Sequence, residues 1–313
     1  MFSRKHFLTR LGVLGAGVLL APRTWAIPPA PGARRLRFGI ISDLHHLQFG
    51  NREETRLRAF MDTVVASKPD FILQNGDFCR PKDSEGIMDQ WNRFTGPKYH
   101  VLGNHDMDVC DKETIMRLWG MERPYYSWDR GGYHFVVMDR NFLKTADGSL
   151  VDYARDNWGP LPSPQRSFTD ATQLAWLRKD LAAATGPIIL FMHQPVWLSD
   201  FFNEIGNAAD ILAIFDEANL AGARVAAVFM GHDHDDRYGE RNGVHYFLLN
   251  SATYAYCDKG AFFYKDSLFA TVTLDPSGVL SMEGRFSTYR DGAPDDVRAR
   301  FPVKISDHAV KAF

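Results

Sequence analysis

The chain has 313 residues, of which 45% are hydrophobic and 24% are charged, and its formal net charge is −2. This composition is typical of a globular protein with a large core. The near-neutral charge argues against a nucleic-acid-binding surface, which usually carries a basic excess.

The first 26 residues have the features of a secretory signal peptide. A basic head around Lys5 precedes an apolar stretch at residues 11–21, which is too short to span a bilayer comfortably. Small residues before position 27 fit cleavage after Ala26. Residues 3–8, SRKHFL, resemble the twin-arginine export motif with Lys5 in place of the second arginine, so this route and general secretion both stay open. We expect an exported protein, periplasmic or extracellular, with no membrane span in the mature chain; an uncleaved membrane anchor is the alternative.

After a proline-rich linker at residues 27–35, short apolar runs alternate with helix-like segments. The apolar runs are Leu36–Ser42, Phe71–Asn75, Tyr99–Gly103, Ile188–Met192 and Val225–Met230. The helix-like segments are Glu53–Ser67, Glu85–Phe94, Lys112–Trp119, Thr169–Thr185 and Ala208–Asn219. Gly186 stands where the C-terminal cap of the fourth helix belongs. Strand–helix alternation on this scale indicates an α/β fold.

Two further stretches are predicted to be β-structure. Residues 124–140 read as a hairpin around the turn Asp129–Gly132. Residues 238–282 contain strand-like runs without helices, which is typical of a β-meander. The segment from Arg290 is charged and carries no clear pattern. We therefore predict one domain over residues 36–289, followed by a tail over residues 290–313.

The three cysteines, Cys79, Cys110 and Cys257, do not make a disulfide framework. Cys79 and Cys110 each follow a polar loop, so a disulfide between them is one interpretation. Buried, unpaired thiols are the favoured alternative.

Each of the five apolar runs ends in side chains that can coordinate metals. In chain order these are Asp43, His45 and His46; Asp77; Asn104, His105 and Asp106; His193; and His232 and His234. A single histidine after a strand is usually a hydrogen-bonded turn residue. Five such strand ends in order favour a shared site, because ligands collect at the carboxyl ends of strands in α/β sheets. The two histidines at positions 232 and 234 project to the same side if the chain there is extended.

This ordered series resembles the calcineurin-like metallophosphoesterases, over residues 38 to about 251. The motifs are D-x-H (43–45), G-D (76–77), G-N-H-D (103–106), H (193) and G-H-x-H (231–234). The resemblance implies an α/β fold of two packed β-sheets flanked by helices, an αββα sandwich. It also implies two divalent ions with Asp77 as the bridging carboxylate. One ion would be held by Asp43, His45, Asp77 and His234, and the other by Asp77, Asn104, His193 and His232.

The chemistry implied is phosphoester hydrolysis. Two ions about 3.5–4 Å apart can clamp a phosphoryl centre and hold a bridging hydroxide that attacks it. Imidazole and carboxylate ligands suit Mn, Fe, Zn or Co and do not choose among them. The resemblance further implies that His105 faces the substrate and protonates the departing oxygen, with Asp106 orienting its ring.

Substrate-binding candidates are weaker. The family often has a polar or acidic residue soon after the G-D pair, whereas Phe78, Cys79 and Arg80 follow here. Arginines suit phosphate, and tyrosines can stack on a ring. His46 either faces the substrate or caps a helix. The candidates are His46, Arg80, Arg140 and Tyr254, with Tyr256 as an alternative to Tyr254.

Residues 101–139 look most like the branch of manganese-dependent ADP-ribose/CDP-alcohol diphosphatases and class III cyclic-nucleotide phosphodiesterases. We therefore expect a small-molecule phosphoester substrate, namely a phosphodiester or pyrophosphate of nucleotide-like character. A broad exported phosphomonoesterase is the alternative. A non-catalytic binding module ranks low, because every expected ligand and His105 are present.

Overall fold

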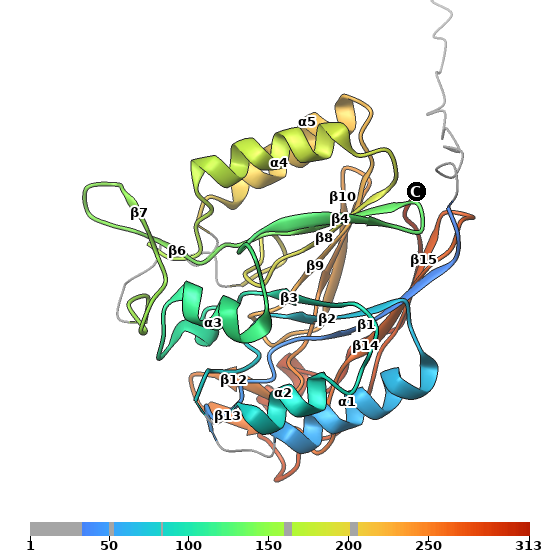
Figure 1. The fold of residues 1–313 in the computed structure, drawn as a ribbon. Helices are drawn as coiled ribbons and strands as arrows, with labels where there is room; N and C mark the ends of the chain where they lie inside the picture. The colour runs from blue at the N-terminus through green and yellow to red at the C-terminus, as the bar shows by residue number, and fades with distance from the viewer. Residues whose placement is uncertain (1–32, 50–52, 83, 160–164, 201–205) are drawn as a thin grey trace, which may run out of the picture.

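The computed structural model describes residues 33–49, 53–82, 84–159, 165–200 and 206–313. In this part of the chain, two six-stranded β-sheets pack face to face between outer helices (Figure 1). The predicted αββα sandwich is therefore confirmed. The predicted signal peptide at residues 1–26 lies outside the described residues.

The first sheet has the order β16-β15-β14-β1-β2-β3. Strands β1, β2 and β3 run parallel, and β14 pairs antiparallel with β1. The strands are β1 (Leu36–Ile41), β2 (Phe71–Asn75), β3 (Lys98–Val101), β14 (Ala270–Leu274), β15 (Val279–Glu283) and β16 (His308–Lys311).

The second sheet has the order β10-β11-β9-β8-β5-β4. Its four central strands are parallel, and the two outer strands pair antiparallel with their neighbours. The strands are β4 (Tyr126–Arg130), β5 (Tyr133–Val137), β8 (Ile188–Phe191), β9 (Val225–Met230), β10 (Arg237–Arg241) and β11 (Val244–Leu248). Each parallel array therefore directs its carboxyl ends to one edge of the sandwich.

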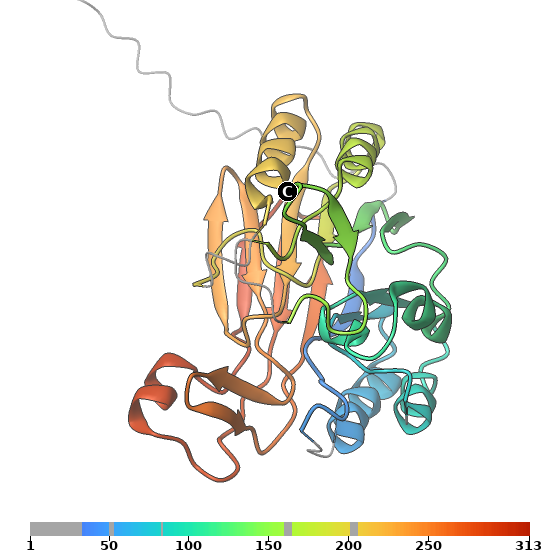
Figure 2. The same cartoon turned by 90° about the vertical axis from the view of Figure 1, so that its left-hand side faces the viewer.

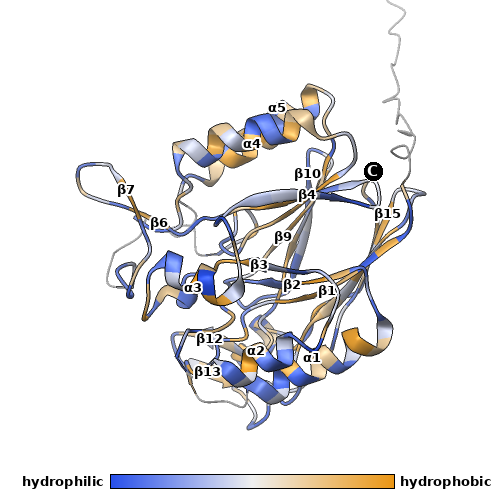
Figure 3. Cartoon of the chain, viewed as in Figure 1, coloured by the Kyte–Doolittle hydropathy of each residue, from blue (hydrophilic) through white to orange (hydrophobic). Residues whose placement is uncertain are grey.

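Aromatic side chains fill the space between the sheets. The Phe38 ring stacks on Phe71 at 4.8 Å between centroids, and it meets Phe191 and Phe229 of the other sheet edge-on. The central strands are largely hydrophobic, whereas the outer helices are mixed (Figure 3). Such a core fixes the distance and orientation between the two sheets.

Helices cover the two outer faces. α1 (Glu53–Ser67) and α2 (Glu85–Trp91) pack on the first sheet, and α4 (Ala171–Ala183) and α5 (Ala208–Leu220) pack on the second. Among the described residues, no helix combines the length and apolar character needed to cross a bilayer. The remaining elements are a 3₁₀ helix (His105–Met107), α3 (Lys112–Trp119), β6 (Phe142–Lys144), β7 (Leu150–Asp152), β12 (Tyr254–Cys257), β13 (Gly260–Phe263) and α6 (Asp295–Arg300).

The predicted hairpin is confirmed, but the predicted cap at Gly186 is wrong. Strands β4 and β5 are joined by Gly131 and Gly132 with φ of 60° and 83°, as a tight hairpin turn requires. Helix α4 ends earlier, and Ala184 is already extended. Gly186 instead allows close packing, because a Cβ there would lie 2.2 Å from the Gly132 carbonyl oxygen.

The C-terminal third also departs from the prediction. The strands after residue 237 do not form one meander, because β10 and β11 join the second sheet while β14 and β15 join the first. The sheet does not stop at residue 289 either. Strand β16 pairs antiparallel with β15, and α6 lies beside the β12–β13 hairpin below the sheets (Figure 2). The alternating, half-exposed character of this short edge strand gave no hydrophobic run to recognise.

Candidate metal centre

The five strand ends meet at one edge of the sandwich. Strands β1, β2 and β3 of the first sheet and β8 and β9 of the second all deliver their following loops to this edge. The ligand candidates that it brings together include two groups with no shared residue whose donor atoms lie within 4.8 Å of one another: Asp43, His45 and His234, and Asp77, His193 and His232. A third group that meets the same criterion, His45, Asp77 and His105, overlaps with both.

Asp77 lies between the two groups. Its Oδ2 atom is 3.7 Å from His45 Nε2 and 3.0 Å from His193 Nε2. In the first group, His234 Nε2 is 2.8 Å from His45 Nε2 and 3.3 Å from Asp43 Oδ1. Asp77 is therefore within reach of a histidine from each group, so its carboxylate could be shared by two ions.

The donor set fits two divalent cations. Asn104 is 2% exposed, and neither its Oδ1 nor its Nδ2 has a hydrogen-bond partner among the described residues. His193 Nδ1 lies 2.9 Å from the Asn75 carbonyl oxygen, which leaves Nε2 facing the carboxylates. A buried polar group without a partner is costly, and a cation beside Asn104 Oδ1 would satisfy it. Asn104, which lines the same cavity as Asp77 and His232, could therefore serve as a ligand.

The buried carboxylates and histidines of the site change the affinity of individual histidines for protons. Burial lowers the pKa of His193, but Asp77 and Asp43 outweigh it and raise that pKa to about 10. Burial lowers the pKa of His45 to about 4. A histidine must be neutral to coordinate a metal, so cations would bind His193 in exchange for a proton.

The ligands sit in a strained backbone. Five ligand candidates have φ in the left-handed region, which is uncommon for residues other than glycine although aspartate and histidine adopt it more often than most: Asp43 (55°), His45 (55°), Asp77 (51°), His232 (75°) and His234 (53°). The interpretation of residues 232–234 as an extended strand end is therefore wrong. Strain of this kind persists at functional sites only where surrounding contacts impose it.

His105 stands beside the two groups and lines the same cavity. Its backbone N–H donates to Asp77 Oδ1 at 2.8 Å, and its ring contacts those of His45 and Trp158 at 5.2 and 4.9 Å between centroids. Burial lowers its pKa, but Asp77 and Asp108 outweigh burial and raise it overall. A raised pKa favours the charged form of the ring, from which His105 could donate a proton.

Asp106 does not orient the His105 ring, which corrects the sequence-based assignment. Its carboxylate accepts hydrogen bonds from the backbone N–H groups of Asp77 at 3.0 Å, Phe78 at 2.7 Å and Gly103 at 2.8 Å. Asp106 thus joins the loops that follow β2 and β3. The ring partner is Asp108, whose Oδ2 lies 3.0 Å from His105 Nδ1.

Of the substrate-binding candidates, Tyr254 lies in the cavity and His46 does not line it. The Tyr254 ring is 4.6 Å from that of His234, and its hydroxyl donates to Gln48 Oε1 at 3.0 Å. His46 Nδ1 lies 3.8 Å from Glu53 Oε2, at the start of α1. His46 therefore faces the first turn of α1 and not the cavity.

The two candidate arginines are engaged elsewhere. Arg80 donates to Asp108 Oδ2 at 2.7 Å and does not line the cavity. Arg140 is fully buried and donates to the Ser167 carbonyl at 2.7 Å. Burial lowers the pKa of Arg140 to about 10. Arg140 therefore supports the fold beneath the site and does not face the cavity that a phosphate would enter.

The cavity above the ligands measures about 350 Å³. Phe49 and Tyr256 at its rim have 47% and 54% of their surface exposed. Its lining includes residues that no local sequence motif marks, namely Gln48, Phe49, Trp158 and Arg166. Asp233, which lies between the two histidines of the G-H-x-H motif, lines it as well.

Cys79 and Cys110 are unpaired and buried, as the favoured interpretation held. Trp119 Nε1 donates to Cys79 Sγ at 3.4 Å, and Cys110 Sγ donates to the Asp106 carbonyl at 3.4 Å. Burial raises the pKa of both thiols, to about 12 for Cys110. Both are therefore thiols that pack the core beneath the site.

The sequence of this chain is similar to those of known metal-dependent phosphoesterases. A sequence model of the calcineurin-like phosphoesterase family matches residues 36–236. A manganese-dependent ADP-ribose/CDP-alcohol diphosphatase of Oryza sativa is 25% identical over 231 residues, 58% of this chain and 68% of the relative. A 3',5'-cyclic-nucleotide phosphodiesterase of Nostoc is 24% identical over 69% of this chain and 76% of the relative. Human tartrate-resistant acid phosphatase type 5 is 28% identical over 65% of this chain and 67% of the relative.

Solved structures give the same fold. A dimetal phosphatase from Danio rerio superposes with a TM-score of 0.64 at 16% identity, covering 89% of this chain and 99% of the other. GAP50, described as the anchor in the inner membrane complex of Plasmodium, gives 0.55 at 15% identity and covers 90% of both chains. At these identities the likeness concerns the fold alone.

Proposed function

We propose that this chain, which belongs to the calcineurin-like phosphoesterase family, hydrolyses a phosphodiester or pyrophosphate bond in a nucleotide-like small molecule. Hydrolysis of phosphoesters with the help of metal ions is what the family and the ligand set support. The bond and substrate class are the proposal. The observation that carries it is the shape and lining of the cavity above the ligands.

The ligand groups would hold two divalent cations, of the kind Mn, Fe, Zn or Co. When bound, such a pair supplies positive charge to a phosphoryl group and lowers the pKa of water. His105 lies next to this centre with its ring against Trp158, and it would protonate the departing oxygen. Proton donation matters most for a poor leaving group, such as the sugar or phosphate of a nucleotide.

The cavity rim suits a planar ring. Phe49 and Tyr256 are about half exposed, and Phe49 meets the buried Tyr254 ring edge-on at 5.1 Å. Exposed aromatic side chains at the mouth of a site offer faces on which a base can stack. The volume of about 350 Å³ lies within the usual range for sites that enclose organic ligands, roughly 300–1,000 Å³. A site for phosphate and a small alcohol needs less room.

The wall on the His105 side carries a cation. Arg166 lines the cavity, and its guanidinium lies 5.8 Å from the Trp158 ring centroid. Because the Trp158 ring also contacts His105, an anionic group on the departing part of the substrate would approach Arg166. A guanidinium binds phosphate well, which favours a substrate with a second phosphate.

The relatives support both this proposal and its alternative. The diphosphatase and the cyclic-nucleotide phosphodiesterase support a nucleotide-like substrate, and the acid phosphatase supports a broad phosphomonoesterase. GAP50 is described as an anchor, so a structural role is a third alternative for a protein with this fold. The complete ligand set argues against that role, because a purely structural member has no need to keep seven metal-binding side chains.

The test uses protein reconstituted with Mn²⁺. We expect faster turnover of bis(p-nitrophenyl) phosphate than of p-nitrophenyl phosphate, and turnover of ADP-ribose or a cyclic nucleotide. Phe49→Ala with Tyr256→Ala should raise KM for the nucleotide but leave the small aryl diester unchanged. Phe286→Ala is the matched control, since Phe286 is 65% exposed and does not line the cavity. Faster monoester turnover would favour the phosphatase alternative, and no turnover with metal bound would end the enzyme proposal.

We also propose that the chain is exported, on the basis of the basic and apolar segments at residues 1–26. Expression of the full chain in a bacterium with an outer membrane should yield periplasmic protein that begins at Ile27. Protein that keeps residue 1 and stays with the membrane fraction would support an uncleaved anchor instead.

A further inference from the structure

We propose that the C-terminal segment Arg300–Ser306 positions the loop that carries His232 and His234, and that the first metal site, made by Asp43, His45, Asp77 and His234, depends on it. We call this segment the C-terminal clamp. The inference goes beyond the family match, which ends at residue 236. It rests on the proposed metal-dependent function only for its activity measurement, since metal binding itself is the primary readout.

The clamp holds the two residues that directly follow His234. Asp235 is 3% exposed, and its Oδ2 accepts hydrogen bonds from Arg300 Nη1 and from Arg237 Nε, both at 2.6 Å. Asp236 Oδ1 accepts from the Ser306 N–H at 3.0 Å, and its Oδ2 accepts from Ser306 Oγ at 2.6 Å. Both ends of the clamp, Arg300 and Ser306, therefore bind the loop that carries His232 and His234.

A second attachment reaches Asp43. Asn250 is fully buried, and its Nδ2 donates to the carbonyls of Pro302 at 3.0 Å and Lys304 at 3.2 Å. The next residue, Ser251, donates from Oγ to the Asp43 carbonyl at 2.8 Å. The clamp is thus connected to two ligands of the same proposed ion, which approach the site from different sheets.

The loop needs such support for a physical reason. His232 and His234 have φ of 75° and 53°, a conformation that is costly for residues other than glycine and persists only where surrounding contacts impose it. Asp235 places a buried charge next to the strained residue, and a buried carboxylate without cationic partners would be expensive. Arg237, two residues further along the chain, and Arg300, in the C-terminal segment, provide those partners.

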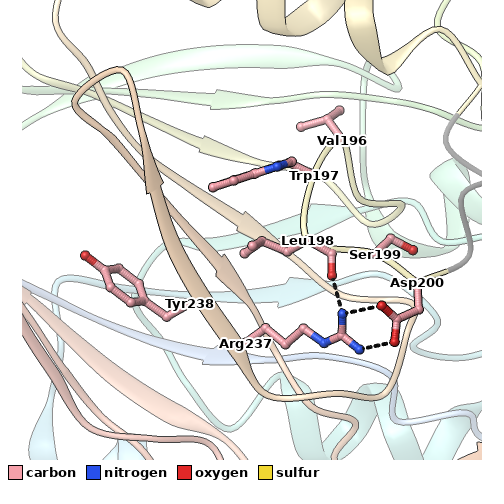
Figure 4. A pocket seen from close by; sticks show the side chains of 7 residues that line it. All are labelled: Val196, Trp197, Leu198, Ser199, Asp200, Arg237 and Tyr238. Carbon is pink, nitrogen blue, oxygen red and sulfur yellow. Dashed lines mark hydrogen bonds and ion pairs between the residues drawn. The ribbon is translucent and has the colours of Figure 1, made fainter.

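A second carboxylate, that of Asp200, holds the two arginines in place. The Arg237 guanidinium donates to the Asp200 carboxylate and also to the Leu198 carbonyl at 2.8 Å (Figure 4). Arg300 pairs with Asp200 as well. Asp200, Arg237, Asp235 and Arg300 therefore form one ion cluster, which ties the loop after β8 to the loop after β9. Two members of this cluster, Asp200 and Arg237, line the hollow drawn in Figure 4, where they pair with each other.

The clamp is anchored well enough to act as a support. The Ile305 N–H donates to the Arg285 carbonyl at 2.9 Å, and the Tyr289 hydroxyl donates to the Phe301 carbonyl at 2.7 Å. Both contacts fix it to the chain that leaves strand β15. On helix α6, which ends at Arg300, Arg298 pairs with Asp295 of the same helix and not with a residue of the metal loop, so it offers a matched control.

The test measures metal binding by the full chain. Arg300→Ala with Ser306→Ala should weaken the binding of one of two Mn²⁺ ions by about 10- to 100-fold, the usual effect of removing supports behind metal ligands. Equilibrium dialysis with elemental analysis gives the affinity, and the absorption spectrum of Co²⁺-substituted protein reports the changed geometry. Arg298→Ala should leave both unchanged, and Arg300→Lys should restore part of the affinity.

Two unchanged metal affinities and an unchanged Co²⁺ spectrum in the folded double variant would overturn the proposal. If that variant does not fold, Ser306→Ala alone decides, because it removes a single hydroxyl and should still weaken one ion measurably. Failure of the proposed function is a separate outcome: wild-type protein with two bound ions would then hydrolyse no phosphoester, while the metal affinities of the variants still answer the question.

Discussion

The Nδ1 atom of His105 lies 3.0 Å from Asp108 Oδ2, and the same carboxylate oxygen accepts a hydrogen bond from Arg80 at 2.7 Å. The two residues belong to a 3₁₀ turn, His105–Met107 with Asp108 as its C-terminal cap. Side chains three residues apart eclipse one another in a 3₁₀ helix, whereas adjacent side chains diverge. Asp108 therefore orients His105, and the neighbouring Asp106 faces the opposite loop.

This relationship predicts that Asp108→Ala lowers kcat without loss of metal. The ring of His105 would lose its orientation and a partner for its charged form, so turnover of diesters with poor leaving groups should fall by about 100-fold. His105→Ala should show the same dependence on the leaving group. Measurement of kcat across a series of aryl diesters, together with elemental analysis, checks this prediction.

Arg80→Ala is the graded control, because it removes only the outer partner of Asp108 and should have a smaller effect. An Asp108→Ala protein that has lost one or both ions, or that slows all leaving groups equally, would contradict the assignment. Metal loss in His105→Ala would instead identify His105 as a ligand.

Asp106 has a different predicted phenotype. Asp106→Ala leaves the backbone N–H groups of Asp77, Phe78 and Gly103 without their acceptor in a buried site. We expect the free energy of unfolding to fall by about 3 kcal/mol or more, because unsatisfied buried donors cost roughly 1–3 kcal/mol each. Denaturant unfolding of the metal-free protein measures this change. A variant with wild-type stability and only a reduced kcat would restore Asp106 to the catalytic role that the sequence suggested.

The metal ligands could be predicted from the sequence because each follows a contiguous apolar run. Strands β2 and β9 have the predicted bounds, Phe71–Asn75 and Val225–Met230, and the polar residues after them lie at the site. Parallel strands bring such ends to one edge whatever the intervening sequence. Knowing where strands β2 and β9 end was therefore enough to predict that Asp77 and His234 lie at the same edge.

Residues placed by the tertiary fold could not be predicted in this way. The role of Asp108 could not be predicted, because no residue pattern indicates that the backbone after Asn104 forms a 3₁₀ helix. Trp158 and Arg166 belong to the segment between β7 and α4, and Arg300 to the C-terminal segment, so only the folded chain brings them to the site. Arg140 was wrongly predicted to bind substrate, because an arginine is usually exposed and nothing in the sequence indicates that this one is fully buried.

Asp77 offers a test of the dinuclear arrangement. Asp77→Ala should lower the occupancy of both ions, because its carboxylate lies between His45 and His193. His234→Ala should lower the occupancy of one ion only. Elemental analysis after dialysis against a fixed Mn²⁺ concentration distinguishes the two patterns. Two tightly held ions in Asp77→Ala would contradict a bridging role, whereas chelation of wild-type protein should abolish turnover and added Mn²⁺ restore it.

His134 makes the stability of the chain depend on pH through contacts away from the metal centre. Its Nδ1 lies 2.8 Å from Asp129 Oδ1, and its Nε2 lies 2.9 Å from Asp180 Oδ2, so the ring joins the β4–β5 hairpin to α4. Burial lowers the pKa of His134, but the hydrogen bonds to Asp180 and Asp129 outweigh it and raise that pKa above its ordinary value. Both ring nitrogens can donate only in the charged form.

The sign of the effect follows from the raised pKa. The folded state binds the proton more tightly than the unfolded state, so the stabilisation is complete below a pH of about 6.5 and is lost as the pH rises through the folded-state pKa. We expect His134→Asn to lower the free energy of unfolding by about 2 kcal/mol at pH 6 and by less at pH 9. Denaturant unfolding of both proteins at each pH, with the same metal content, gives the difference, in which the titration of all other groups cancels. A difference that stays constant between pH 6 and pH 9 would show that His134 contributes through packing and not through its charge.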